Sequence, residues 1–376
     1  MSMEQLVEMS NRYGKDENYV LLGGGNTSYK EDGVMRVKGS GSALASVNPE
    51  DFIPMDTAKL LSLLEKPYPS DDDAREAEVL LDMMAAKVPQ PGADAEKRPS
   101  VECILHAVFK NKFALHLHPA MINGLTCSNG GEQECLKILG KDVAWAPRAK
   151  PGYSLSKACY DAFNKFEAEN GRPPQLMILQ NHGIFISADT VEEIDALLSA
   201  VMAKLKARIK EEPYFTPVPE PPEADGHAAK LAELYASHNG SGESVFCVNS
   251  LVLDFAKDSA SMEPLSLPYT PDHVVYCKGA PLYIKKGEDM DEAFATFAKT
   301  EGYAPKIVVI QDMGFFALGN TKREADNARL LFLDAMKITV YARSFGGPVT
   351  LTRDIVRFMV YWEFETYRLK QDKPVE

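Results

Sequence analysis

The sequence has few cysteines, and none of them lies in a pair suited to a metal or a disulfide framework. The six cysteines are scattered singly between Cys103 and Cys277, and no two of them have the C-x-x-C spacing. Neither a cysteine-ligated zinc site nor a disulfide-stapled scaffold is therefore indicated. Isolated thiols are typical of a reducing compartment, so we expect the protein in the cytoplasm.

The sequence also lacks long apolar runs and an excess of positive charge. No apolar run is long enough to span a bilayer, and residues 1–14 form an acidic amphipathic helix pattern rather than a secretory signal. With 41 Lys and Arg against 54 Asp and Glu, the net charge is −13. That charge argues against nucleic acid or an anionic membrane as the main partner.

One proline-rich segment divides the chain. Glu211–Asp225 has five prolines in fifteen positions, and proline lacks the backbone donor that helices and sheets need. We therefore expect a linker at 212–225. It would separate a domain of residues 1–211 from a domain of residues 226–376, and two domains are also what a length of 376 residues suggests.

The two halves share a pattern. Leu179–Asp195 and Ile310–Asp326 match at six of seventeen positions, and each contains a Thr-x-x-Glu capping box after an apolar, strand-like run. Asn48–Asp56 and Thr270–Lys278 also resemble each other. Chance similarity of one strand-turn-helix unit is the alternative to a repeat. Strands and helices interleave throughout, which predicts an α/β protein with a second, smaller and degenerate repeat.

Three histidines are spaced as metal ligands. His116 and His118 form H-L-H in a strand-like run, and alternation along a strand sends both imidazoles to one face. His182 follows the buried strand pattern LMILQN. Three histidines with an open fourth position are typical of catalytic zinc. The alternative is packed or surface histidines without a metal.

A carboxylate stands upstream of these histidines, in RPSVECILHAVF. Pro99 and Ser100 predict a helix start with Ser100 as N-cap. Glu102 then lies in the first turn and His106 one turn later. Glu102 is either a general base beside the metal or a carboxylate favoured by the helix dipole, and His106 is either a partner of the site or a packed histidine.

Two glycine-rich stretches, GGGNTS at 23–28 and KGSGSAL at 38–44, are candidates for binding an anion. The first is neither a P-loop nor a Rossmann fingerprint, because G-x-x-x-x-G-K-[ST] is absent and Ser28 replaces the third glycine. Bare backbone donors together with Asn26 can approach a phosphate or a carboxylate. Two tight hairpin turns are the alternative.

Taken together, GGGNTS, KGSGS, PSVE, HLHP and NHG resemble the class II aldolase/adducin family, in family order across residues 20–210. The resemblance implies a three-layer α/β/α fold with a mostly antiparallel central sheet, and a homo-oligomer. It also implies zinc, or another divalent metal, on His116, His118 and His182, with Glu102 as the catalytic residue. The family's phosphate-binding positions fall on the following residues: Gly25, Asn26, Gly39 and Ser100. Val101 departs from members that carry a second phosphate-binding serine there.

The more specific resemblance is to the aldolase part of bifunctional rhamnulose-1-phosphate aldolase/alcohol dehydrogenases, without their dehydrogenase part. It implies zinc-dependent cleavage of a ketose 1-phosphate to dihydroxyacetone phosphate and a small aldehyde. A sugar-phosphate epimerase and a sugar-acid phosphate decarboxylase would use the same ligands, and an adducin-like scaffold would be non-catalytic. The second half has Met313 where the first has His182, so we expect it to hold no metal.

Overall fold

The computed structural model describes residues 2–90 and 96–362. The chain divides into two compact units, the first comprising residues 2–126 and 130–208 with Tyr361 and Trp362, the second residues 127–129 and 209–360. Each unit is considered by itself. The described helices include none that combines the length and the apolar character needed to cross a bilayer.

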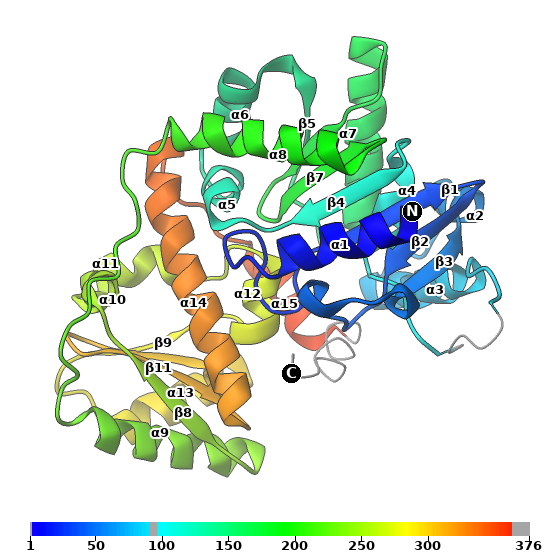
Figure 1. Ribbon diagram of the computed structural model, residues 1–376. Coiled ribbons are helices and arrows are strands. Elements are labelled where there is room, and N and C mark those ends of the chain that lie inside the picture. Colours follow the sequence, from blue (N-terminus) through cyan, green and yellow to red (C-terminus); the bar gives the residue numbers. More distant parts are fainter. Residues whose placement is uncertain (1, 91–95, 363–376) are drawn as a thin grey trace. The chain divides into compact units, whose positions relative to one another are not determined.

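The first unit is built on a seven-stranded sheet of order β3-β2-β1-β4-β7-β6-β5 (Figure 1). Its strands are β1 (Asn26–Glu31), β2 (Val34–Lys38), β3 (Phe52–Asp56), β4 (Phe113–Leu117), β5 (Val143–Ala146), β6 (Leu176–Leu179) and β7 (Gly183–Ala188). The expectation was a mostly antiparallel sheet. The observed sheet is mixed, because β5 and β6 run parallel while the other neighbours run antiparallel.

Helices lie on both faces of this sheet. The longer ones are α1 (Ser2–Gly14), α3 (Asp72–Ala85), α6 (Gly131–Leu139), α7 (Tyr153–Asn170) and α8 (Val191–Lys206); the short ones are α2 (Thr57–Leu63), α4 (Cys103–Val108) and α5 (Ala120–Thr126). Successive side chains of β1 show the two faces: Thr27 bonds Ser10 of α1, and Ser28 bonds His106 of α4. Every residue of β4, β6 and β7 is buried, as a covered central layer requires.

The hairpin between β1 and β2 has the tight turn that its sequence predicts. Glu31 pairs with Val34, and the two residues between them, Asp32 and Gly33, have φ of 49° and 77°. Positive φ at both positions defines a type I′ turn, for which Asp-Gly is a preferred sequence. The turn fixes the register of β1, which carries Asn26 at its first position.

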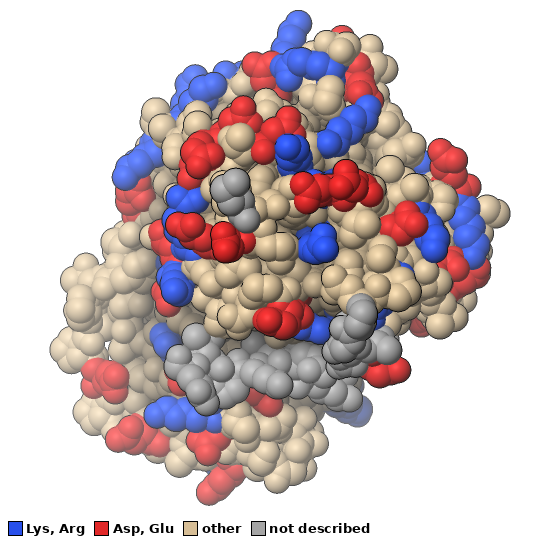
Figure 2. All heavy atoms as spheres, turned by 45° about the vertical axis from the view of Figure 1, so that its right-hand side comes forward, with Lys and Arg blue, Asp and Glu red and all other residues tan. Residues whose placement is uncertain are grey.

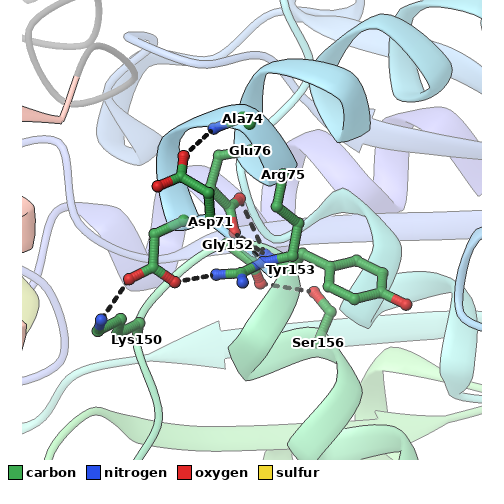
Figure 3. A network of polar contacts seen from close by, with 9 residues as sticks. Asp71, Ala74, Arg75, Glu76, Lys150, Gly152, Tyr153 and Ser156 are labelled. Atoms are coloured by element: carbon green, nitrogen blue, oxygen red, sulfur yellow. Dashed lines mark hydrogen bonds and ion pairs between the residues drawn. The ribbon is translucent and has the colours of Figure 1, made fainter. Parts of the chain in front are cut away.

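A network of ionic contacts joins α3 to the start of α7 (Figure 3). Glu76 accepts a hydrogen bond from the backbone N–H of Tyr153 at 3.1 Å, where a carboxylate is favoured by the helix dipole. Lys150 and Arg75 both bond the carboxylate of Asp72. Burial raises the pKa of Glu76. This network fixes the loop that leads from β5 into α7.

The second unit contains a four-stranded sheet of order β8-β11-β10-β9. Its strands are β8 (Glu243–Cys247), β9 (Leu282–Ile284), β10 (Ile307–Ile310) and β11 (Gly314–Gly319), and its helices are α9 (Ala224–Asn239), α10 (Ser250–Ala256), α11 (Ser259–Met262), α12 (Pro271–Cys277), α13 (Met290–Glu301), α14 (Lys322–Ala342) and α15 (Arg353–Tyr361). The pairings β8-β11 and β10-β11 are antiparallel and β9-β10 is parallel. The segment β4-β7-β6-β5 of the first unit has the same order and directions, so the two units share this part of their topology.

Backbone contacts at the turns confirm the repeat. Asn181 and Asp312 both have positive φ, 56° and 61°. The N–H of Asn181 donates to Thr126 O at the end of α5, and the N–H of Asp312 donates to Ala256 O at the end of α10. The helices that follow, α8 and α14, have the predicted Thr N-caps.

One part of the repeat expected from the sequence is wrong. Residues 49–56 form a single turn and strand β3, whereas Pro271–Cys277 is a helix. In the second unit, α12 precedes β9, as α6 precedes β5 in the first. The similar letters at Asn48–Asp56 and Thr270–Lys278 therefore belong to different elements.

Candidate metal centre

His116 and His118 meet at the end of the central strand β4. His116 lies within the strand, His118 directly after it, and their Nε2 atoms are 2.8 Å apart. His116 is fully buried, and its Nδ1 donates to the carbonyl oxygen of Ile184 in β7 at 2.9 Å. This bond places the proton on Nδ1 and leaves the Nε2 lone pair facing His118, as in a histidine prepared to bind a metal.

His182 reaches the same point from the turn between β6 and β7. The ligand nitrogens of His116, His118 and His182 lie within 4.8 Å of one another. Gly183 makes this approach possible, because a Cβ there would lie 2.3 Å from Leu117 O and 2.9 Å from His118 Cδ2. Within residues 2–90 and 96–362 this is the one group of three or more His, Cys, Asp or Glu side chains arranged to hold a metal.

The donor set fits a divalent ion such as zinc. Burial lowers the pKa of His116 to about 4, so its imidazole is neutral and its lone pair is available at neutral pH. Three neutral imidazoles leave the full charge of the ion uncompensated and a fourth coordination position open. The buried Oε1 of Glu102 faces the same point, close to the Nε2 atoms of His116 and His182.

Glu102 lies beside the three histidines, as the sequence predicted for a base. Its Oε1 is 2.9 Å from His182 Nε2 and 3.2 Å from His116 Nε2. Burial opposes ionisation of this carboxyl, but when no metal is bound the attraction to a protonated imidazole outweighs burial and holds the pKa of Glu102 well below its ordinary value. A bound divalent ion would act in the same direction. The carboxylate is therefore ionised at neutral pH and can accept a proton.

The predicted N-cap at Ser100 is wrong. Helix α4 begins at Cys103, and the residue at the cap position is Glu102, whose side chain makes no capping bond. Ser100 Oγ instead accepts hydrogen bonds from the Glu102 backbone N–H at 3.3 Å and from Asn26 Nδ2 at 3.2 Å. This local turn bends the chain so that Glu102 points toward the histidines rather than along the helix.

Three of the four residues expected to bind an anion lie close to this carboxylate or to the metal ligands. Asn26 Nδ2 donates to Glu102 Oε2 at 2.5 Å, so the Asn26 amide is engaged with the base itself. Gly25 has φ of 66°, and a Cβ there would lie 3.0 Å from His116 O. The N–H of Gly39 donates to Asp51 O at 2.8 Å. The structure thus brings Gly25, Asn26 and Ser100 to the metal ligands or the base, and engages the Gly39 N–H elsewhere.

Two residues near the site were not assigned from the sequence. Lys38, the first letter of KGSGS, is buried, and its Nζ donates to Ser42 O at 2.6 Å. It brings a positive charge into the loop considered for an anion, and its place in that motif was the available signal. His106 bonds Asn26 and Ser28, which its spacing from Glu102 alone could not specify.

The second unit lacks the ligands. His116 pairs with Phe185 in the first sheet, and Phe246 pairs with Phe316 at the equivalent place in the second. The same alignment puts Val248 at the position of His118, and Met313 at the position of His182. Phenylalanine and valine offer no donor atom and methionine is a poor ligand for zinc, so the second unit keeps the topology without the three-histidine donor set.

The surface shows no large area of positive charge on the face in Figure 2. Acidic and basic side chains are interspersed there, and the chain as a whole is acidic. A protein that binds the phosphate backbone of a nucleic acid needs a surface where basic side chains cluster. This face offers none.

Comparison with known proteins agrees with the site. Residues 4–204 match the family model of the Class II Aldolase and Adducin N-terminal domain. This segment includes the three histidines, Glu102 and both glycine-rich stretches.

Individual relatives are more distant. An uncharacterized oxidoreductase, YuxG of Bacillus subtilis (strain 168), is 24% identical over 430 residues, covering 99% of this chain and 59% of the relative. The N-terminal class II aldolase domain of a conserved protein from Thermoplasma acidophilum is 27% identical, covers 56% of this chain and 94% of that chain, and superposes with a TM-score of 0.47. An L-fuculose-1-phosphate aldolase from Thermus thermophilus is 16% identical. The match covers 54% of this chain and 92% of that chain, with a TM-score of 0.34. This chain thus spans less than two thirds of the length of the curated relative that it matches.

Proposed function

Because the chain belongs to the class II aldolase and adducin family, whose model matches more than half of it, we propose that it is a metal-dependent aldolase. The substrate is a ketose 1-phosphate of the rhamnulose-1-phosphate type, and the products are dihydroxyacetone phosphate and a small aldehyde. The observation that carries the proposal is the convergence of three imidazole nitrogens with a buried carboxylate 2.9 Å from one of them.

The histidines and Glu102 divide the chemistry between them. A divalent ion held by His116, His118 and His182, zinc in this proposal, supplies the positive charge that stabilises negative charge on the substrate's carbonyl oxygen. In the condensation direction, Glu102 takes the proton from the carbon that becomes the nucleophile. In the cleavage direction, Glu102 accepts the proton of the substrate hydroxyl whose carbon becomes the aldehyde, the carbon–carbon bond breaks, and Glu102 then gives a proton to the carbon that held that bond. A base in this position contributes about 10²–10⁴-fold to the rate.

The loops near Glu102 bind the substrate's anionic end in this proposal. Ser100 and the backbone at Gly25 would lie closest to the anion, the loop of Gly39 would need to free its N–H from Asp51 to take part, and Lys38 adds a positive charge in that loop. All six cysteines are free, which supports a cytoplasmic enzyme. A homo-oligomer remains a prediction from the family resemblance.

Other activities on the same residues are weaker proposals. An epimerase or a decarboxylase would use the same ligands and the same base, so the reaction products decide among the enzymes. A non-catalytic, adducin-like scaffold is disfavoured because all three histidines and Glu102 are present and converge. The name oxidoreductase belongs to a Bacillus subtilis relative that is longer than this chain.

Product analysis tests the proposal. The zinc-loaded protein is incubated with a panel of ketose 1-phosphates and sugar-acid phosphates while dihydroxyacetone phosphate is trapped enzymatically. We expect trapped dihydroxyacetone phosphate with at least one ketose 1-phosphate and its loss after chelation. Carbon dioxide release or an epimeric sugar without trapped product would instead support the decarboxylase or the epimerase. No reaction by the zinc-loaded protein with any substrate would support the scaffold.

A further inference from the structure

His106 is a fully buried histidine whose two ring nitrogens both have polar partners. It lies on α4, is inaccessible to solvent, and packs edge-on against Phe185 with ring centroids 4.9 Å apart. Its Nδ1 is 2.8 Å from Ser28 Oγ, and its Nε2 bonds Asn26 Oδ1. We propose that His106 is a positioning residue that orients the Glu102 carboxylate through the Asn26 amide.

The bond between Asn26 and Glu102 sets the direction of the other bonds in this chain. Asn26 Nδ2 donates to Glu102 Oε2, since an amide nitrogen only donates. The Asn26 oxygen then faces His106 Nε2, which must carry the proton. His106 Nδ1 is therefore an acceptor, and the Ser28 hydroxyl donates to it. The four groups therefore have one consistent set of donors: Ser28 donates to His106, His106 donates to Asn26, and Asn26 donates to Glu102.

This arrangement determines which oxygen of Glu102 faces the histidines. Oε2 is held by Asn26 Nδ2 at 2.5 Å, and Oε1 is left 2.9 Å from His182 Nε2. If the Asn26 amide turned over, its oxygen would face the carboxylate and the two acceptors would repel each other. His106 prevents that turn by donating to the Asn26 oxygen. The inference rests on the proposed role of Glu102 as the base.

Packing alone does not account for His106. A phenylalanine or leucine would fill the same space against Phe185, and a buried ring nitrogen without a partner is costly. Here both ring nitrogens of His106 have partners on one face of β1, namely Ser28 Oγ and Asn26 Oδ1. Since Asn26 also donates to Ser100 Oγ at 3.2 Å, each polar atom of its amide has a partner. A fully satisfied network of this kind holds a side chain in one orientation.

Two substitutions separate the positioning role from a structural one. His106→Gln keeps a nitrogen donor near the place of Nε2 and can still donate to Asn26. His106→Asn is shorter, can reach Ser28, and cannot reach Asn26. Both put a neutral amide in the same buried place, so both are expected to lower the thermal unfolding midpoint. His273→Gln is the matched control, since His273 is also a buried, hydrogen-bonded histidine, bonded to Thr270 in the second unit.

The readouts are kcat, KM and metal content for the substrate found in the trapping assay, and crystal structures of the metal-loaded variants. We expect His106→Asn to lose roughly 10–100-fold in kcat, the range seen for residues that orient metal-site groups, with metal content unchanged. His106→Gln and His273→Gln should keep most of the wild-type kcat. The crystal structures should show the Asn26 amide and Glu102 displaced only in His106→Asn.

Equal kcat loss in the Asn and Gln variants, or an unmoved Glu102 carboxylate in His106→Asn, would overturn the positioning role. If the wild-type protein turns over none of the sugar phosphates, the proposed function fails. The crystal structures of the same variants would then still decide whether His106 orients Glu102. Should His106→Asn not fold, Ser28→Ala with the same readouts replaces it. That variant removes the donor to Nδ1, and an unchanged Asn26 orientation with unchanged kcat would count against the chain of bonds.

Discussion

At the scale of single residues, the site depends on contacts that come from distant parts of the chain. His116 is ready to bind a metal because Ile184, sixty-eight positions later, accepts the proton on its Nδ1. The H-L-H spacing predicted that His116 and His118 share a face, and the structure confirms it. The spacing could not give the tautomer, because that depends on which carbonyl lies opposite in the neighbouring strand.

The structure places Glu102 beside the histidines, as the sequence predicted, but the local structure that positions it differs from the expected one. A first-turn position on a helix capped by Ser100 was expected, whereas Glu102 itself precedes α4. Its direction comes from Ser100 and from Asn26, seventy-six positions away. The motif PSVE includes the serine that forms the turn, but a local motif cannot reveal that Asn26 binds the carboxylate. The same limit applies to His106, whose partners lie on β1.

Substituting Glu102 separates its chemical role from its place beside the metal. Glu102→Gln keeps the size and the hydrogen bonding to Asn26 but removes the basic carboxylate. It should retain metal and lose about 10²–10⁴-fold in kcat, whereas His116→Ala should lose both metal and activity. Steady-state kinetics with metal analysis on the same samples is the measurement. Wild-type turnover in Glu102→Gln would assign this carboxylate a purely structural role.

At the scale of elements, β1 carries a costly group next to the site. Its Asn26, Ser28 and Lys30 share one face by strand alternation. The Nζ of Lys30 is buried and has no hydrogen-bond partner among the described residues. Burial lowers the pKa of Lys30 to about 7. The ammonium is therefore poorly accommodated in the folded protein, and this strand is less stable than its length and pairing suggest.

Compared with the wild type, Lys30→Met should have a higher free energy of unfolding below about pH 7. Between about pH 7 and 10.5, its free energy of unfolding should depend less on pH. Between about pH 7 and 10.5, the unfolded chain holds a proton on Lys30 that the folded chain does not, so wild-type stability should rise with pH there. The rise is on the order of 1.4 kcal/mol for each pKa unit. Urea unfolding across this range measures it.

The control for that experiment is Lys112→Met, which removes an exposed lysine. It should leave the slope of stability against pH as in the wild type. A Lys30→Met protein that keeps the wild-type slope, or that is destabilised below neutral pH, would show that the Lys30 ammonium is well solvated in the folded state.

The repeat illustrates which elements a sequence pattern can predict. The strand-turn-helix unit β6-β7-α8 and its counterpart β10-β11-α14 were predicted from the matching letters, because capping boxes and buried strands are local features. The likeness of Asn48–Asp56 to Thr270–Lys278 was misleading, since a short apolar run with a proline fits a strand or a first helical turn equally well. Tertiary packing decided between them.

At the scale of the whole molecule, the chain carries two versions of one strand arrangement and, in the part that the structure describes, one candidate metal centre. The first unit has three converging histidines, and the second has Phe246 and Met313 where two of them would lie. The duplication of topology was visible in the sequence because glycine and capping positions persist in both copies. In the sequence, the missing ligands were visible from Met313 and from the absence of a segment like PSVE or HLHP between Pro271 and Gln311. Phe246 could be aligned with His116 only through the strand register.

Calorimetric titration of the chelator-stripped protein, residues 1–376, with zinc tests the account most directly. The wild type should bind one ion per chain. His182→Met, which introduces the residue found in the second unit, should abolish tight binding because a poor ligand replaces one of three. His238→Met, at an exposed histidine of α9, should bind as the wild type does. No binding by the wild type, two tightly bound ions per chain, or unchanged affinity in His182→Met would contradict a single metal centre on His116, His118 and His182.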